Sequence, residues 1–109
     1  MRTVDIHNDN QNENRVRYDI DNEIAFAKRE KDKLLCLIVG YGSSGKSHKV
    51  KNYAIMYLDE LKEKKRIVDY ILGNDIDIFN PKYQTFKGRE NIPEDIKKSH
   101  NLGIIIVKV

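Results

Sequence analysis

A short apolar run between charged and glycine-rich segments is the feature that most restricts how this chain can fold. Residues 34–39 read Leu-Leu-Cys-Leu-Ile-Val, and Gly40 follows at once. The run is too short for an independent helix, and its unbroken apolar character is typical of a strand covered on both faces. The sequence therefore predicts an interior strand over residues 34–39.

Helical periodicity flanks this run on both sides. Before it, apolar residues recur at intervals of four, four and three, at Val16, Ile20, Ile24 and Ala27. This spacing predicts an amphipathic helix over residues 14 to about 31. After it, a second stripe predicts a helix over residues 47–64 and comprises Val50, Tyr53, Ala54, Tyr57, Leu58 and Leu61. A buried strand between two amphipathic helices indicates an α/β layer structure, with its first strands parallel.

The remaining apolar segments predict three more strands. Residues 3–7 alternate between apolar and polar side chains, residues 67–72 form a short apolar segment, and residues 104–109 form an apolar terminal strand. Together with the run described above, they predict a four-stranded sheet with two main helices. The length suits one compact α/β domain over residues 1–109.

Two polar stretches separate these elements. Residues 8–14 predict a loop that caps the first helix, because Asn and Asp dominate it. Residues 74–101 contain both prolines and predict an irregular segment with a short helix near residues 81–86.

Composition says more about where the protein is found in the cell than about what it does. Charged residues make up 34% of the chain and the net charge is +3, a mildly basic balance that permits nucleic-acid binding without requiring it. No stretch approaches the 18 apolar residues that a membrane span needs, so we expect no membrane partner. The single cysteine, Cys36, lies in the apolar run and is expected in the core. These features predict a soluble cytoplasmic protein.

The loop after the apolar run matches a nucleotide-binding pattern. Residues 40–47 read Gly-Tyr-Gly-Ser-Ser-Gly-Lys-Ser, which satisfies G-x-x-x-x-G-K-[ST]. Lys46 and Ser47 would then contact phosphates and Mg²⁺. The context fits poorly, because the motif follows a complete βα unit and the best candidate for the metal-holding aspartate is Asp69. A small P-loop nucleotide-binding protein is therefore an alternative hypothesis.

Three short segments in order along the chain support a different interpretation. They are Asp5-Ile6-His7, Gly40-Tyr41-Gly42 and Asn101-Leu102-Gly103, and with the helix after the glycine loop they resemble the Smr (small MutS-related) domain family. That family has a D-L-H-G signature, an H-G-x-G loop and a closing N/G-x-G strand. The resemblance implies a compact βαβαββ sandwich, nucleic-acid binding and, in several members, endonuclease activity with sites in the first two motifs.

The sequence departs from the family pattern at two positions. Asn8 replaces the glycine after the histidine, and Asn tolerates the same left-handed backbone. Val39 replaces the histidine before G-x-G, which removes a phosphate ligand or catalytic group. The residues therefore favour binding over cleavage.

Physical reasoning places these residues at one site. Asp5 and His7 are predicted at the end of the first strand, beside the loop that follows the second, because parallel strands end at the same edge. Catalytic roles are predicted for Asp5 and His7, with His7 as general acid or base and Asp5 orienting it. Phosphate binding is predicted for the loop and the second helix, at Gly40, Tyr41, Gly42, Gly45, Lys46 and Lys49.

Other properties of this site stay open at the level of sequence. One carboxylate and one histidine form an incomplete metal site, so the sequence does not decide whether Mg²⁺ or Mn²⁺ takes part. The expected partner is DNA or RNA, in addition to a larger protein that supplies specificity. A non-catalytic interaction module is the third hypothesis.

Overall fold

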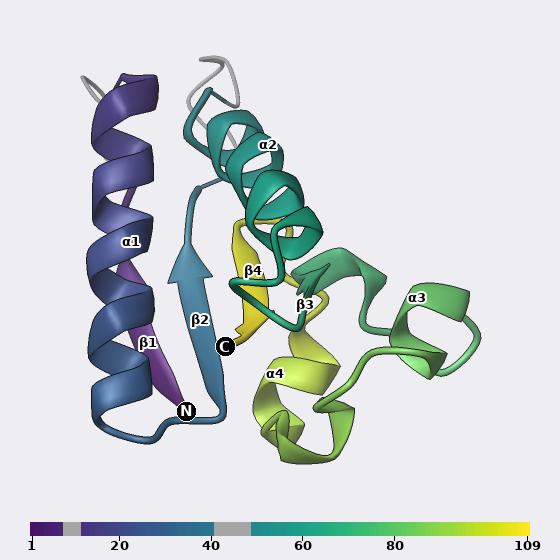
Figure 1. The fold of residues 1–109 in the computed structure, drawn as a ribbon. Coiled ribbons are helices and arrows are strands. Elements are labelled where there is room, and N and C mark those ends of the chain that lie inside the picture. The colour runs from purple at the N-terminus through teal and green to yellow at the C-terminus, as the bar shows by residue number, and fades with distance from the viewer. Residues whose placement is uncertain (8–11, 41–48) are drawn as a thin grey trace.

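A four-stranded mixed sheet separates two layers of the molecule (Figure 1). The computed structural model describes residues 1–7, 12–40 and 49–109. The strand order is β1-β2-β4-β3, in which β1 and β2 are parallel and β4 is antiparallel to both β2 and β3. The elements are β1 (Arg2–Asp5), α1 (Glu13–Arg29), β2 (Leu34–Ile38), α2 (Lys49–Glu63), β3 (Asp69–Leu72), α3 (Pro81–Gln84), α4 (Glu94–Ser99) and β4 (Ile104–Lys108).

The predicted α/β class and the order of the main elements are confirmed, with small differences at the ends. The first strand ends at Asp5 rather than at His7, although the Ile6 N–H still donates to the carbonyl of Ile38. The Asp5 carboxylate accepts the His7 backbone N–H just beyond the strand. Helix α1 begins after Asn12, whose side chain accepts the backbone N–H of Arg15 at 2.9 Å. The predicted cap is therefore present.

The two faces of the sheet bury separate apolar clusters. Leu35 and Leu37 of β2 face the layer of α1 and α2, whereas Leu34 and Cys36 face the other layer. Strand β4 alternates in the same way. Because both sides of β2 are covered, the run lacks the alternation of a strand with one face in water. The predicted interior strand is confirmed.

The segment between β3 and β4 forms the second layer of the molecule. Residues 73–101 contain α3, α4 and two 3-10 turns, and they contribute Ile76, Phe86 and Ile92 to the cluster behind the sheet. The short helix near residues 81–86 is confirmed as α3, while α4 was not predicted. Among the residues that the structure describes, no helix is long and apolar enough to cross a membrane.

Cys36 is expected to be unreactive in the folded protein. Its side chain is buried in β2, and burial raises the pKa of the thiol to about 11, while a hydrogen bond with Thr3 opposes this rise. Because the thiolate is the reactive form, alkylation near neutral pH should be at least roughly 100-fold slower than in a denatured chain. Iodoacetamide labelling followed by mass spectrometry, with and without urea, checks this. Equal rates under the two conditions would contradict a buried Cys36.

Candidate functional site

Three segments distant in sequence meet where β1 and β2 end. The parallel register places Asp5 opposite Ile38, and the antiparallel register places Ile38 opposite Ile104 at the start of β4. Helices α1 and α2 both begin at this end of the molecule (Figure 1). We call this region the carboxyl edge, and it comprises residues 5–7, 39–40 and 101–103.

The His7 ring packs directly over the glycine that follows β2. A β-carbon built on Gly40 would lie 2.6 Å from His7 Nδ1, and the φ angle of Gly40 is +71°. His7 Nδ1 lies 3.1 Å from the backbone oxygen of Val39. Because a carbonyl oxygen only accepts, Nδ1 is the donor in this contact.

Asp5 positions the main chain of His7 rather than its ring. Asp5 Oδ1 accepts the backbone N–H of His7 at 2.8 Å, which forms an Asx turn at the end of β1. The imidazole is therefore oriented by the Val39 carbonyl and not, as the sequence predicted, by Asp5. The Asp5 carboxylate instead fixes the backbone position of His7. Both effects place the ring at the carboxyl edge.

The segment before β4 completes this edge through its backbone. The carbonyl of Gly103 accepts the N–H groups of Val39 and Gly40, at 2.8 and 3.2 Å. Asn101 Oδ1 accepts the N–H of Gly103 at 2.8 Å, which forms a second Asx turn. Lys51 Nζ donates to the carbonyl of Leu102 at 2.8 Å, so this lysine of α2 ties the helix to the segment.

The structure brings together some of the predicted site residues. Asp5, His7 and Gly40 lie at the carboxyl edge, and Lys49 is the exposed first residue of α2. Other predicted phosphate-binding residues fall outside the described residues, and these are Tyr41, Gly42, Gly45 and Lys46.

The P-loop hypothesis loses its metal-holding residue. Asp69 pairs with Lys108, which also pairs with Leu34 at the beginning of β2, whereas Gly40 follows the end of β2. The carboxylate of Asp69 binds Lys62 Nζ at 2.8 Å. A P-loop needs its aspartate near the Mg²⁺ at the phosphates, and Asp69 lies at the opposite edge of the sheet.

No group of three or more histidine, cysteine or carboxylate side chains in the described parts of the chain could hold a metal ion. At the carboxyl edge, Asp5 and His7 are the two residues of these types, fewer than such a group needs. Bound phosphate oxygens would supply further ligands to Mg²⁺ or Mn²⁺ if such an ion takes part.

Sequence reasoning missed the backbone groups that hold this site. The carbonyls of Val39 and Gly103 and the Asx turn of Asn101 have no side-chain signature of catalysis. Asn101-Leu102-Gly103, named above for the family resemblance alone, also carried a signal for this turn, since Asn and Gly favour turns.

The comparisons with known proteins add no relative. No family model, no curated protein and no solved structure matches the chain.

Proposed function

We propose that this protein is a Smr-like domain that binds DNA or RNA through the sugar-phosphate backbone at the carboxyl edge. The observation that supports this proposal is the convergence of residues 5–7, 39–40 and 101–103 at one place. They include Asp5-Ile6-His7, Gly40 and Asn101-Leu102-Gly103 from the motifs on which the family resemblance rests, and these motifs are far apart in the sequence. A general α/β fold does not require a His ring, a glycine with positive φ and an Asx turn at the same edge.

The electrostatics of this end favour an anionic ligand. Helices α1 and α2 both begin at this end (Figure 1), and helix N-termini attract phosphate. Lys49 adds an exposed cation at the first residue of α2. Lys46 is predicted from the sequence to add another.

The geometry of His7 suits a nicking reaction on the bound strand. With Nδ1 donating to Val39, Nε2 accepts a proton from a water molecule whose oxygen attacks the phosphorus. The bond from phosphorus to the leaving sugar oxygen breaks, and that oxygen takes a proton from solvent. Asp5 serves as a positioning residue in this scheme, because its carboxylate holds the His7 main chain.

Fluorescence anisotropy across a salt series tests binding. Labelled single-stranded, duplex and branched DNA and RNA serve as probes, and ATP and GTP analogues run in parallel. We expect salt-sensitive binding, and Lys49→Gln should reduce the slope of log affinity against log salt by about 0.9 on duplex DNA if it contacts one phosphate. Lys82→Gln is the matched control, because Lys82 is exposed on α3.

A nicking assay with and without Mg²⁺ or Mn²⁺ tests catalysis. His7→Gln should slow cleavage by roughly 100-fold or more while the protein stays folded, since loss of a general base costs this much. Binding of nucleic acid without cleavage would indicate a binding domain that has no nuclease activity. Tight nucleotide binding with no nucleic-acid binding would overturn the proposal in favour of the P-loop hypothesis.

A further inference from the structure

Exposed cations gather where α1 and α2 end, away from the carboxyl edge. We call this set the basic end, and its exposed members are Lys28, Arg29, Lys31, Lys33, Lys62, Lys64, Lys65 and Arg66. These cations lie in two segments, residues 28–33 and 60–69. The carboxylates in the two segments are fewer, and they are Glu30, Asp32, Glu60, Glu63 and Asp69. The basic end therefore carries an excess of positive charge, in a protein whose net charge is only +3.

Specific contacts join the two halves of the basic end. Lys28 Nζ at the end of α1 donates to the carbonyl of Arg66 after α2, at 2.8 Å. Leu34, which follows Lys33, and Asp69, which binds Lys62, both pair with Lys108 in the sheet register. The cations of the two segments therefore form one surface.

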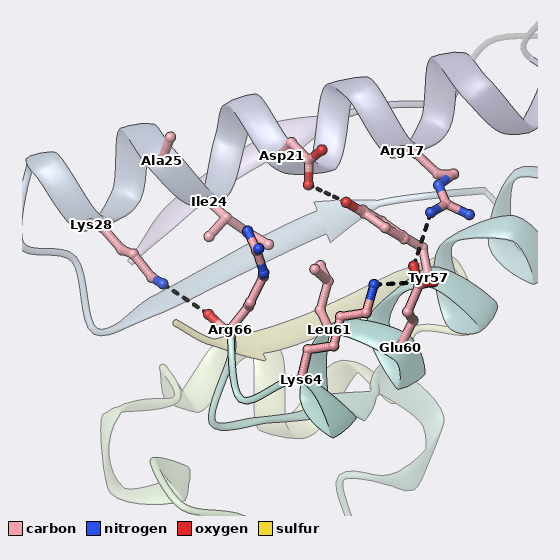
Figure 2. A pocket seen from close by; sticks show the side chains of 10 residues that line it. All are labelled: Arg17, Asp21, Ile24, Ala25, Lys28, Tyr57, Glu60, Leu61, Lys64 and Arg66. Carbon is pink, nitrogen blue, oxygen red and sulfur yellow. Dashed lines mark hydrogen bonds and ion pairs between the residues drawn. The ribbon is translucent and has the colours of Figure 1, made fainter.

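The groove between α1 and α2 shows where the charge is unbalanced. This groove has a volume of about 600 Å³ and ends at Lys28 and Arg66 (Figure 2). Toward its opposite end, Glu60 binds Arg17 at 2.9 Å and Lys64 at 3.6 Å (Figure 2). Arg66 forms no ion pair with any of the described residues, so positive charge dominates that end.

Two lysines of the basic end occupy backbone positions that favour glycine. Lys31 and Lys65 both have φ of 60° and close the ends of α1 and α2. The flanking bonds form a Schellman motif at each helix: Asp32 N–H donates to Ala27 O and Arg66 N–H to Leu61 O, both at 2.8 Å. A lysine at this position is strained relative to glycine, and strain of this kind concentrates at functional sites.

We propose that the basic end is a second nucleic-acid contact surface, which binds backbone phosphates independently of the carboxyl edge. Lysine-rich, exposed surface suits phosphate contacts, whereas protein interfaces are depleted in lysine and enriched in aromatic residues. Membrane-surface binding usually adds an apolar face, and Val68 is the exposed large apolar residue of these two segments. This inference rests on the proposed function for the class of ligand but not for the location.

The test replaces the two strained lysines in a way that separates charge from backbone strain. Lys31→Gly with Lys65→Gly removes both charges and relieves both strained positions. We expect the slope of log affinity against log salt for duplex DNA to fall by about 2, if each lysine contacts one phosphate. In 0.5 M salt, where helix-dipole effects are screened, the midpoint of thermal unfolding should rise by about 4 °C or more. Lys31→Arg with Lys65→Arg should keep the wild-type slope.

The control removes the same charge elsewhere, by Lys82→Gln with Lys98→Gln in the layer of α3 and α4. A smaller effect of this control supports the basic end, and an equal effect overturns it. Unchanged affinity in the glycine variant also overturns it, because Lys31 and Lys65 would then make no phosphate contact. Binding to phosphatidylserine vesicles without binding to DNA or RNA identifies a membrane surface instead. If variants of the carboxyl edge bind nucleic acid as tightly as the wild type while the glycine variant binds it weakly, only the proposal for the carboxyl edge is refuted.

Discussion

Replacing Gly73 by Ala is expected to destabilise the protein by roughly 3 kcal/mol, because the new methyl group has no space. A β-carbon at Gly73 would lie 2.1 Å from the backbone oxygen of Asn101 and 2.6 Å from the Ile104 side chain. The nearer neighbour is backbone and cannot rotate away. Urea unfolding followed by circular dichroism measures the loss of stability.

This substitution also tests how the carboxyl edge is held. Asn101 would have to move, and its side chain supports Gly103, whose carbonyl binds the backbone of Val39 and Gly40. Gly88→Ala is a contrasting variant, because its neighbours at 3.1 Å are flexible side-chain atoms of Leu34 and Lys108 and its cost comes from a φ angle of +131°. A loss of stability below about 1 kcal/mol at Gly73 would contradict the close packing against Asn101.

Replacing Gly40 by Ala is expected to displace the His7 ring. The φ angle of +71° strains any residue with a β-carbon, which costs about 1–2 kcal/mol, and the new methyl group would lie 2.6 Å from Nδ1. Because the ring belongs to a side chain, it can rotate away, and the contact with the Val39 carbonyl is then lost. Nucleic-acid cleavage, if it occurs, should fall about as far as in His7→Gln.

Nitrogen NMR of the histidine side chains measures this displacement directly. In the wild type, His7 should favour the tautomer with the proton on Nδ1, because the Val39 carbonyl accepts it. In Gly40→Ala this preference should disappear. His100, an exposed residue at the end of α4, is the internal control. An unchanged His7 tautomer would mean that the Val39 carbonyl does not orient the ring.

The elements on the α1 and α2 side could be predicted because their periodicity is simple. The apolar stripe from Val16 to Ala27 and the one from Val50 to Leu61 pack against the same face of the sheet, as their spacing indicates. The run at residues 34–39 also indicated that the second face is covered. It did not reveal the cover, since Ile76, Phe86 and Ile92 are isolated in a polar segment without periodicity.

The candidate site was predictable at the level of strand ends and not at the level of hydrogen bonds. Parallel strands place Asp5 beside the residues after Ile38, so proximity follows from topology. The partner of each polar atom depends on distances of a few tenths of an ångström. Asp5 therefore binds a backbone N–H and Lys51 binds the carbonyl of Leu102, and no residue pattern distinguishes these contacts from alternatives.

The position of β4 in the sheet has a consequence for synthesis on the ribosome. Strand β4 lies between β2 and β3, yet it is made after both. Until Ile104 to Lys108 emerge, β3 has no neighbour in the sheet and β2 presents one open side with apolar residues on both faces. A nascent chain that lacks this strand cannot close either core, and its exposed strand edges are suited to unwanted pairing with other chains. The order of synthesis therefore makes the last strand the step that commits the molecule to its native state.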